Sequence, residues 1–168
     1  MVIRMARCED AEAFFAMLCR LDRETVYMMY EPDERAASSD AGKLRSRIEG
    51  GLSGGDLILV AEEDGAIAGF LWAERGQPRR IAHTAYIVVG IREPYRGRGL
   101  GTGFFHRLDE WARANGVLRL ELTVECANSA ALRLYEKSGF AIEGVRRGSM
   151  LVDGALVDEY YMAKVFRA

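Results

Sequence analysis

Apolar residues recur along this chain at two spacings, and each spacing predicts its own kind of element. In the stretch LRLELTV, residues 118–124, apolar and polar residues alternate, which is the period of a strand with one buried face. After Asp10, which can cap a helix, apolar residues recur three and four positions apart, at Ala13, Phe14, Met17, Leu18 and Leu21. Strands and helices are therefore expected to interleave along one chain.

Six further stretches have the composition of strands. They are VIRMA (2–6), DLILVAEE (56–63), AIAGFLWAER (66–75), AHTAYIVVGI (82–91), AIEGVRRGSMLV (141–152) and ALVDEYYMAKV (155–165). Asp64-Gly65 and Asp153-Gly154 separate neighbouring stretches, and such dipeptides supply the positive φ of tight hairpin turns. The chain thus predicts about seven strands, with two hairpins among them.

Three further helices are expected, each with a recognisable end. Residues 40–51, DAGKLRSRIEGG, predict a short helix that ends at its glycines. Residues 102–116 place Phe104, Leu108 and Trp111 on one face and stop at Asn115-Gly116. A last helix follows an Asn128 cap and ends at Gly139.

The order of these elements predicts the fold class. An antiparallel meander followed by two strand-helix units gives a mixed sheet of the α/β (α+β) class. No low-complexity segment, repeat or linker interrupts the chain, so we expect a single domain over residues 1–168. The stretch from Arg23 to Asp40 has poor periodicity and contains Pro32, and its place between two helices makes it a candidate pocket wall.

Composition and charge exclude several classes of function. Lys and Arg number 23 against 25 Asp and Glu, so the net charge of −2 gives no general attraction to nucleic acid or to a membrane. The start, MVIRMARCED, is unlike a signal peptide and no apolar run approaches a membrane span, so a cytoplasmic protein is expected. The three cysteines and two histidines have no metal-ligand spacing, and we expect free thiols and no metal.

A charged, glycine-rich stretch, YRGRGLGTG (95–103), precedes the helix at 102–116. Its glycines let backbone amides approach a ligand, and the first turn of a helix presents unpaired N–H groups at its positive end. Arg96 and Arg98 can add charge-assisted contacts to phosphate oxygens. The stretch therefore predicts a diphosphate site, the alternative being a sharp turn with solvated arginines.

The spacing within this stretch narrows the choice of ligand. Thr102 or Phe104 stands where the dinucleotide fingerprint G-x-G-x-x-G requires its last glycine, although Glu121 lies at about the distance of a ribose-binding acid. The P-loop pattern G-x-x-x-x-G-K-[ST] is absent. Dinucleotides and nucleoside triphosphates are therefore the weaker alternatives.

Two motifs resemble those of the GNAT superfamily of acyl-CoA-dependent N-acetyltransferases. Arg96, Gly99 and Gly101 match its phosphate loop, [RQ]-x-x-G-x-[GA], and residues 128–140 match its signature N-x-x-A-x-x-L-Y-x-K-x-G-F. The resemblance covers residues 57–164 and is vague before Asp56. It implies a twisted, mostly antiparallel sheet of about seven strands, flanked by about four helices, whose central strands splay apart.

By this resemblance the co-substrate is acetyl-CoA, bound without a metal. Its pantetheine arm is expected to pair with backbone near Gly90, a lone strand glycine that is consistent with a bulge or a close backbone approach. Its pyrophosphate is expected at the amides of the glycine-rich stretch. The full set of predicted cofactor residues is Val89, Gly90, Ile91, Arg96, Gly97, Arg98, Gly99, Leu100, Gly101, Thr102, Asn128 and Tyr135.

Tyr135 is the predicted catalytic residue. A thiolate expelled from a thioester benefits from a proton donor, and a phenol with an ordinary pKa of about 10 is protonated at neutral pH. The alternative is a core tyrosine of an amphipathic helix. The general base stays open among Glu74, His83, Glu121, Glu125 and a water relay. No basic residue adjoins Cys126 in the sequence, so direct transfer in a ternary complex is expected rather than a covalent route.

The acceptor is expected to be the primary amine of a small molecule such as a free amino acid, because residues 77–91 and 143–165 resemble bacterial enzymes of that kind. Glu24 or Glu31 can hold its ammonium beside an apolar pocket lined by Tyr27, Met28, Met29 and Tyr30. The alternative for these residues is packing between helices or in a dimer.

Other functions stay open at this point. One is acetylation of a protein N-terminus, such as that of a ribosomal protein, and another is a non-catalytic CoA-binding module. A homodimer is an expectation from the resemblance alone. Neither the identity of the acceptor nor the range of acyl groups follows from the sequence.

Overall fold

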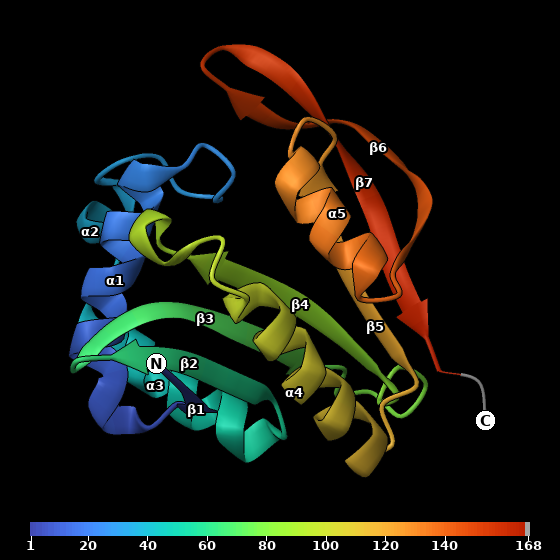
Figure 1. Ribbon diagram of the computed structural model, residues 1–168, viewed down its shortest axis with the longest axis horizontal. Coiled ribbons are helices and arrows are strands. Elements are labelled where there is room, and N and C mark those ends of the chain that lie inside the picture. The colour runs from blue at the N-terminus through green and yellow to red at the C-terminus, as the bar shows by residue number, and fades with distance from the viewer. Residues whose placement is uncertain (167–168) are drawn as a thin grey trace.

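The computed structural model describes residues 1–166, and its strands form one seven-stranded sheet (Figure 1). In chain order the strands are β1 Val2–Met5, β2 Leu57–Glu63, β3 Ala66–Arg75, β4 Thr84–Ile91, β5 Arg119–Glu125, β6 Ala141–Val152 and β7 Ala155–Val165. They lie side by side as β1-β2-β3-β4-β5-β7-β6, and every neighbouring pair is antiparallel except β4 with β5. The predicted mixed, mostly antiparallel sheet is confirmed.

The described residues form five α-helices and two short 3-10 turns. In chain order they are η1 Cys8–Asp10, α1 Ala11–Glu24, α2 Glu34–Ser38, α3 Ala41–Gly54, η2 Glu93–Tyr95, α4 Leu100–Ala114 and α5 Ser129–Lys137. Figure 1 shows α4 and α5 in front of the sheet and α1 and α3 behind it. Within residues 1–166 no helix is both long enough and apolar enough to cross a membrane.

Strand β2 shows that the first half of the sheet is buried on both faces. Leu57, Leu59 and Ala61 lie in the core shared with α4 and α5, while Ile58 and Val60 lie in a second core with α1 and α3. This continuous apolar run is typical of a strand covered on both sides. Among the described residues the second core contains none from β5, β6 or β7. We call this uncovered side of β5, β7 and β6, together with β4 as far as the exposed Val88, the open face.

The two central strands separate after a short pairing. Tyr86 with Glu121 is the last of three residue pairs between β4 and β5, and the described part of β5 makes no later pair with β4. From there β4 stays beside β3 and β5 stays beside β7, so the strands diverge toward the top of the view (Figure 1). The splayed strands implied by the resemblance are confirmed.

Gly90 does not mark a bulge in β4, contrary to one of the two expectations for it. The register of β4 against β3 runs without interruption from Ala85 to Ile91. A Cβ at Gly90 would instead lie 2.5 Å from Leu21 Cδ2 on α1 and 2.8 Å from Phe70 Cε1 on β3. The glycine is therefore explained by the side chains packed against it, rather than by a bulge or by a close approach of backbone.

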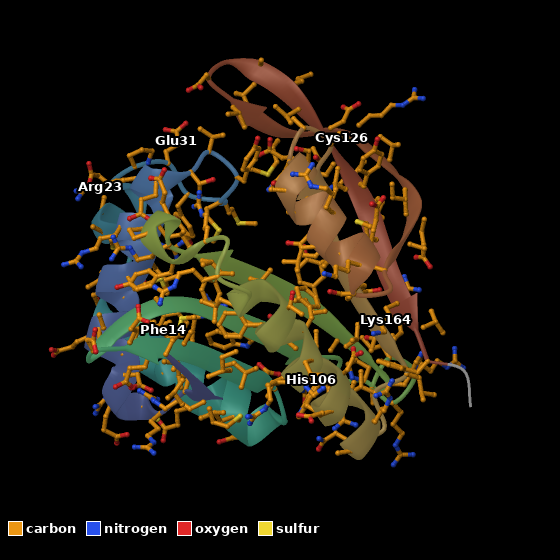
Figure 2. All side chains as sticks on the ribbon, viewed as in Figure 1. Phe14, Arg23, Glu31, His106, Cys126 and Lys164 are labelled. Carbon is orange, nitrogen blue, oxygen red and sulfur yellow. The ribbon has the colours of Figure 1, made fainter. Side chains whose placement is uncertain are left out.

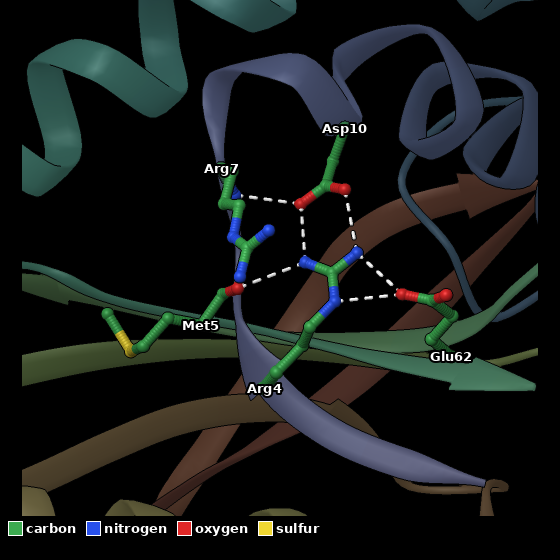
Figure 3. A network of polar contacts seen from close by, with 5 residues as sticks. All are labelled: Arg4, Met5, Arg7, Asp10 and Glu62. Carbon is green, nitrogen blue, oxygen red and sulfur yellow. Dashed lines mark hydrogen bonds and ion pairs between the residues drawn. The ribbon is translucent and has the colours of Figure 1, made fainter. Parts of the chain in front are cut away.

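Asp10 does not cap α1 with its side chain. Its carboxylate accepts hydrogen bonds from both terminal nitrogens of Arg4, at 2.7 and 2.8 Å, and from the backbone N–H of Arg7, at 2.7 Å (Figure 3). Arg4 also donates from Nε to Glu62 on β2, at 2.8 Å. The network joins β1 to β2 and to the turn before α1, which offsets the missing cap.

The helices also differ from prediction at their boundaries. α3 does not end at Gly50 and Gly51 but continues to Gly54, and Gly55 terminates it with a φ of 88°. α2 lies in the stretch with poor periodicity, because five residues are too few to show a helical period. On α1 the expected apolar face is buried except for Ala13, which is exposed.

Gly90→Ala is expected to lower the free energy of unfolding by about 1–3 kcal/mol, because the added methyl group overpacks the contact between α1 and β3. Gly50→Ala is the control: no atom lies within 4 Å of a Cβ at this exposed helical position. The same change there should raise the free energy of unfolding by about 0.5–1 kcal/mol. Urea unfolding measures both, and an unaltered Gly90→Ala variant would refute the close-packing account.

Candidate functional site

The glycines between β4 and α4 have two structural roles. Gly97 and Gly99 take positive φ values of 71° and 80°, and no atom lies within 4 Å of a Cβ at either position. Conformation alone therefore requires glycine there. Gly101 instead lies against α5, where a Cβ would come within 2.7 Å of Leu134 Cδ2. The connection is thus both a turn and a close contact between the two helices.

The backbone N–H groups of residues 97–102 have no acceptor in the described part of the chain. The N–H of Arg96 is bonded to the carbonyl of Glu93, and the next bond along the chain is from Gly103 to the carbonyl of Gly99, at 3.0 Å. The intervening amides lie at the N-terminus of α4, where the helix dipole is positive. Such amides suit the oxygens of a diphosphate, and the diphosphate site itself stays a prediction.

The two arginines of the connection differ in how many of their guanidinium N–H groups already have a hydrogen-bond partner. Arg98 forms a bidentate salt bridge with Glu63 on β2, at 2.6 and 2.8 Å, which raises the pKa of Arg98 and lowers that of Glu63. Arg96 donates from Nε to the carbonyl of Ile91, at 2.9 Å, and its terminal nitrogens have no partner among residues 1–166. Arg98 can therefore offer a phosphate its backbone amide, whereas Arg96 retains free guanidinium N–H groups.

Strand β4 presents a free backbone edge to the split. Its other edge is paired with β3, whereas pairing on the β5 side stops at Tyr86. Val89, Gly90 and Ile91 all lie on this free segment. An extended ligand placed here would gain backbone hydrogen bonds as an added strand does.

Tyr135 belongs to the core and is also a suitable acid. Its side chain packs against Phe105, with ring centroids 5.5 Å apart, and against Phe140, and the residue is 8% exposed. Burial raises the pKa of Tyr135 well above its usual value, and the nearby Tyr86 adds to the effect. The phenol therefore stays protonated at neutral pH, so its packing and the role of proton donor are compatible.

Asn128 caps α5 as predicted, since its side-chain oxygen accepts the N–H of Ala131 at 3.1 Å. Cys126, two residues earlier, is a free, half-buried thiol, like Cys8 and Cys19. Within residues 1–166 no group of three or more His, Cys, Asp or Glu is placed to hold a metal ion.

Two of the candidate bases, Glu74 and Glu121, lie on strands, and a third, His83, lies in the turn before β4. Glu121 is bonded to Arg119 Nε at 2.7 Å, which holds it as a paired carboxylate. Glu74 and His83 are exposed, and the His83 carbonyl accepts the N–H of Arg119 at 3.1 Å. None of the three hydrogen-bonds to Tyr135 in the described chain.

Glu125 is the one buried candidate. It is 6% exposed and faces the equally buried Glu159 across the β5–β7 register. Burial, and then the charge of Glu159, raise the pKa of Glu125. Arg146 donates to Glu159 at 3.3 Å, while the enclosed Oε1 of Glu125 has no partner among the described residues. Glu125 therefore holds a proton readily but offers an acceptor little surface.

A pocket of about 580 Å³ opens between the loop after α1 and the tip of the β6–β7 hairpin. Its walls are residues 22–32, residues 150–153 and Arg96. Figure 2 labels Arg23 in the last turn of α1 and Glu31 on this loop, which lies beside the upper end of the split. The residues predicted to form an apolar wall all line it: Tyr27, Met28, Met29 and Tyr30.

Glu24 is already occupied and is poorly placed to bind an ammonium group. Its carboxylate accepts two bonds from Arg92, at 2.6 and 3.0 Å, and one from the backbone N–H of Glu93, at 2.8 Å. Burial opposes ionisation of Glu24, but these bonds outweigh it and lower its pKa. Glu24 thus ties the pocket loop to the start of the β4–α4 connection.

Arg92, Tyr86 and Thr123 make polar contacts beside the split that the sequence did not reveal. The hydroxyls of Tyr86 and Thr123 lie 2.9 Å apart, joining β4 to β5 at the split. Both residues lie within ordinary strand patterns, and no local signal distinguishes them. They become visible only from the pairing of two strands that are distant in the sequence.

Comparison with known sequences gives one consistent family. Residues 16–140 match the model of the acetyltransferase (GNAT) family. An L-amino acid N-acetyltransferase of Escherichia coli is 35% identical over 111 residues, which make up 64% of this chain and 67% of that protein. Matches to the next three curated relatives cover only 52%, 39% and 28% of their lengths.

Solved structures share the fold along the whole chain. A GNAT-family acetyltransferase from Streptococcus pneumoniae has a TM-score of 0.92 at 30% identity, covering 99% of both chains. A putative acetyltransferase from Salmonella typhimurium, solved with its cofactor acetyl-CoA, has a TM-score of 0.88 at 22% identity. It covers 100% of this chain and 95% of its own, and this second likeness bears on the fold alone.

Thr102→Pro tests the diphosphate site. Thr102 is exposed in the first turn of α4, where proline is tolerated and removes an N–H that has no partner in the described chain. A charge-assisted hydrogen bond contributes about 1.5–3 kcal/mol, so the Kd for CoA, measured by calorimetry, should rise about 10- to 100-fold.

Thr102→Ala is the matched control, because it removes the side chain and keeps the amide. It should bind CoA as the parent protein does. Equal affinity in both variants, with the fold retained in thermal unfolding, would show that the amide does not contact the diphosphate.

Proposed function

This chain belongs to the acetyltransferase (GNAT) family, and from that membership we propose that it transfers the acetyl group of acetyl-CoA to the primary amine of a small molecule, a free amino acid or a related amine. Acetyl-CoA-dependent N-acetyl transfer is the activity of the family. What we propose beyond this family activity is that the acceptor is a small molecule and that its amine attacks acetyl-CoA directly.

The pocket beside the split carries the proposal of a small acceptor. Its volume of about 580 Å³ lies within the range of about 300–1,000 Å³ that is usual for small-molecule sites. Its wall combines Met28 and Met29 with polar groups such as Glu31 and Arg96, which suits a compact molecule with both apolar and charged parts. The E. coli relative, named for L-amino acids, supports the same class of acceptor.

The chain has groups that suit each part of acetyl-CoA, the donor of the acetyl group. The unpaired amides of residues 97–102 and the free terminal N–H groups of the Arg96 guanidinium would bind the diphosphate. The free edge of β4 at Val89, Gly90 and Ile91 would pair with the amides of the pantetheine arm. Asn128 and Tyr135 would then lie near the end of that arm, where the acetyl group is transferred.

Tyr135 would act as the general acid. The amine nitrogen forms a bond to the acetyl carbon and releases its surplus proton to solvent. The carbon–sulfur bond breaks, and the phenolic proton of Tyr135 neutralises the departing thiolate, after which the phenol regains a proton from solvent. The raised pKa of the buried phenol keeps that proton available until the thiolate forms. No described basic side chain hydrogen-bonds to the thiol of Cys126, which favours direct attack by the amine over an acyl-enzyme.

Tyr135→Phe should lower kcat by at least about 100-fold, because the acid is lost. The ring contacts with Phe105 and Phe140 remain, so the Kd for acetyl-CoA should be unaltered. Cys126→Ala is the comparison and should keep most of the activity. A loss in Cys126→Ala as large as that in Tyr135→Phe would contradict direct transfer.

The acceptor class is tested by CoA release, followed with a thiol reagent, across L-amino acids, polyamines, aminoglycosides and peptides with free N-termini. We expect release with amino acids or related small amines. Release with peptides alone would favour acetylation of a protein N-terminus, and CoA binding without any acceptor-dependent release would favour a non-catalytic module. The homodimer and the cytoplasmic location stay predictions.

A further inference from the structure

Two hydroxyl groups meet where the central strands part. Tyr86 Oη and Thr123 Oγ1 lie 2.9 Å apart. Tyr86 is the last residue of β4 that pairs with β5, and Thr123 follows two residues after its partner Glu121. This hydrogen bond is therefore a side-chain link at the closed end of the split, where the two strands begin to separate.

Both side chains point to the open face. Side chains alternate along a strand, and the residues on either side of Tyr86 and Thr123 are buried in the core with α4 and α5: Ala85, Ile87, Leu122 and Val124. Tyr86 and Thr123 therefore face away from those helices. Tyr86 is 41% exposed, so a ligand on the open face can reach its hydroxyl.

A second phenol lies on the other side of the split. Tyr135 packs in the core with α4 and α5, and Tyr86 is near enough to influence its ionisation. The buried phenol faces the side that carries the β4–α4 connection and its open amides. The exposed phenol faces the side without helices, from which an acceptor has a free approach.

The surroundings of Tyr86 also suit an amine. Its register partners are Glu74 on β3 and Glu121 on β5, so a carboxylate lies on each side of the phenol on the open face. Glu121 is paired with Arg119, while Glu74 makes no ion pair within the described chain. The negative charge of these carboxylates attracts a cationic amine. Among residues 1–166 no carboxylate forms a hydrogen bond with the Tyr86 hydroxyl.

We propose that the Tyr86–Thr123 hydroxyl pair receives the attacking amine and carries its proton to solvent, an inference that rests on the proposed function. The ammonium group first loses one proton to solvent, and as the neutral nitrogen then bonds to the acetyl carbon, its surplus proton passes to Tyr86 Oη. The phenolic proton of Tyr86 moves to Thr123 Oγ1, and the hydroxyl proton of Thr123 moves to water. Tyr135 separately gives one proton to the thiolate and regains one from solvent, so no further reactant is needed.

This relay takes the place of a carboxylate base. Glu125 is enclosed against Glu159 and Glu121 is held by Arg119, so neither offers a free oxygen beside the split. Glu74 has a carboxylate that is free within residues 1–166 but lies on β3, one strand away from the split. A chain of two hydroxyls moves a proton without leaving a net charge on either group, and positioned proton-transfer groups contribute about 10²–10⁴-fold to a rate.

Tyr86→Phe, Thr123→Val and the double variant test the relay, with Tyr161→Phe as the matched control. Tyr161 is the β7 partner of Thr123 and is 47% exposed, so it is a surface tyrosine one strand farther from the split. With an acceptor that the parent enzyme acetylates, each single relay variant should lower kcat about 10- to 100-fold, since water can partly replace a hydroxyl. The double variant should be no slower than the slower single, and Tyr161→Phe should be unaltered.

The Kd for acetyl-CoA and the midpoint of thermal unfolding distinguish a proton relay from a hydrogen bond with only a structural role. Both should match the parent protein in the relay variants, because the strands and the donor site are untouched. Unaltered kcat in Tyr86→Phe, or a kcat loss accompanied by weaker acetyl-CoA binding and a lower thermal midpoint, would overturn the relay. Failure of the parent protein to acetylate any amine would instead overturn the proposed function.

Discussion

Strands β4 and β5 share three residue pairs and then separate, which leaves each with an edge that has no strand partner beyond Tyr86 in the described chain. Unpaired backbone groups are costly unless water or a ligand satisfies them. In a fold that retains such an edge at its centre, the unpaired N–H and C=O groups of the edge are available to form hydrogen bonds with an extended ligand. The free segment of β4 leads directly into the open amides before α4, so one continuous stretch of backbone presents both kinds of contact.

Polar contacts hold the loops around this split in place. Arg98 anchors the β4–α4 connection to Glu63 on β2, and Glu24 joins the pocket loop to Arg92 and to the N–H of Glu93. The regions proposed to bind acetyl-CoA and the acceptor amine are thereby fastened at neighbouring points of one segment. Groups held in advance lose little freedom when a ligand binds, which favours both affinity and alignment of the reacting groups.

Much of the fold could be predicted from the sequence, because strand alternation and turn dipeptides act over a few residues. The two hairpins at Asp64-Gly65 and Asp153-Gly154 and the cap at Asn128 form as predicted. The errors concern residues whose partners are distant. Position 90 has no room for a larger residue because Leu21 of α1 and Phe70 pack against it. The carboxylate of Asp10 binds Arg4 instead of capping α1. Neither Leu21 nor Arg4 could be assigned to these contacts from local pattern.

By itself, the sequence determined the order of strands and helices, the expectation of an anion site around Gly97 and Gly99, and the resemblance to a family, because each depends on residues close together in the chain. Only the tertiary structure decided which polar groups stay free. It pairs Arg98 with Glu63, encloses Glu125 against Glu159, and brings the hydroxyl of Tyr86 to Thr123. These outcomes depend on strand register and on packing between segments far apart in sequence, where a side chain's availability is set by its neighbours in space.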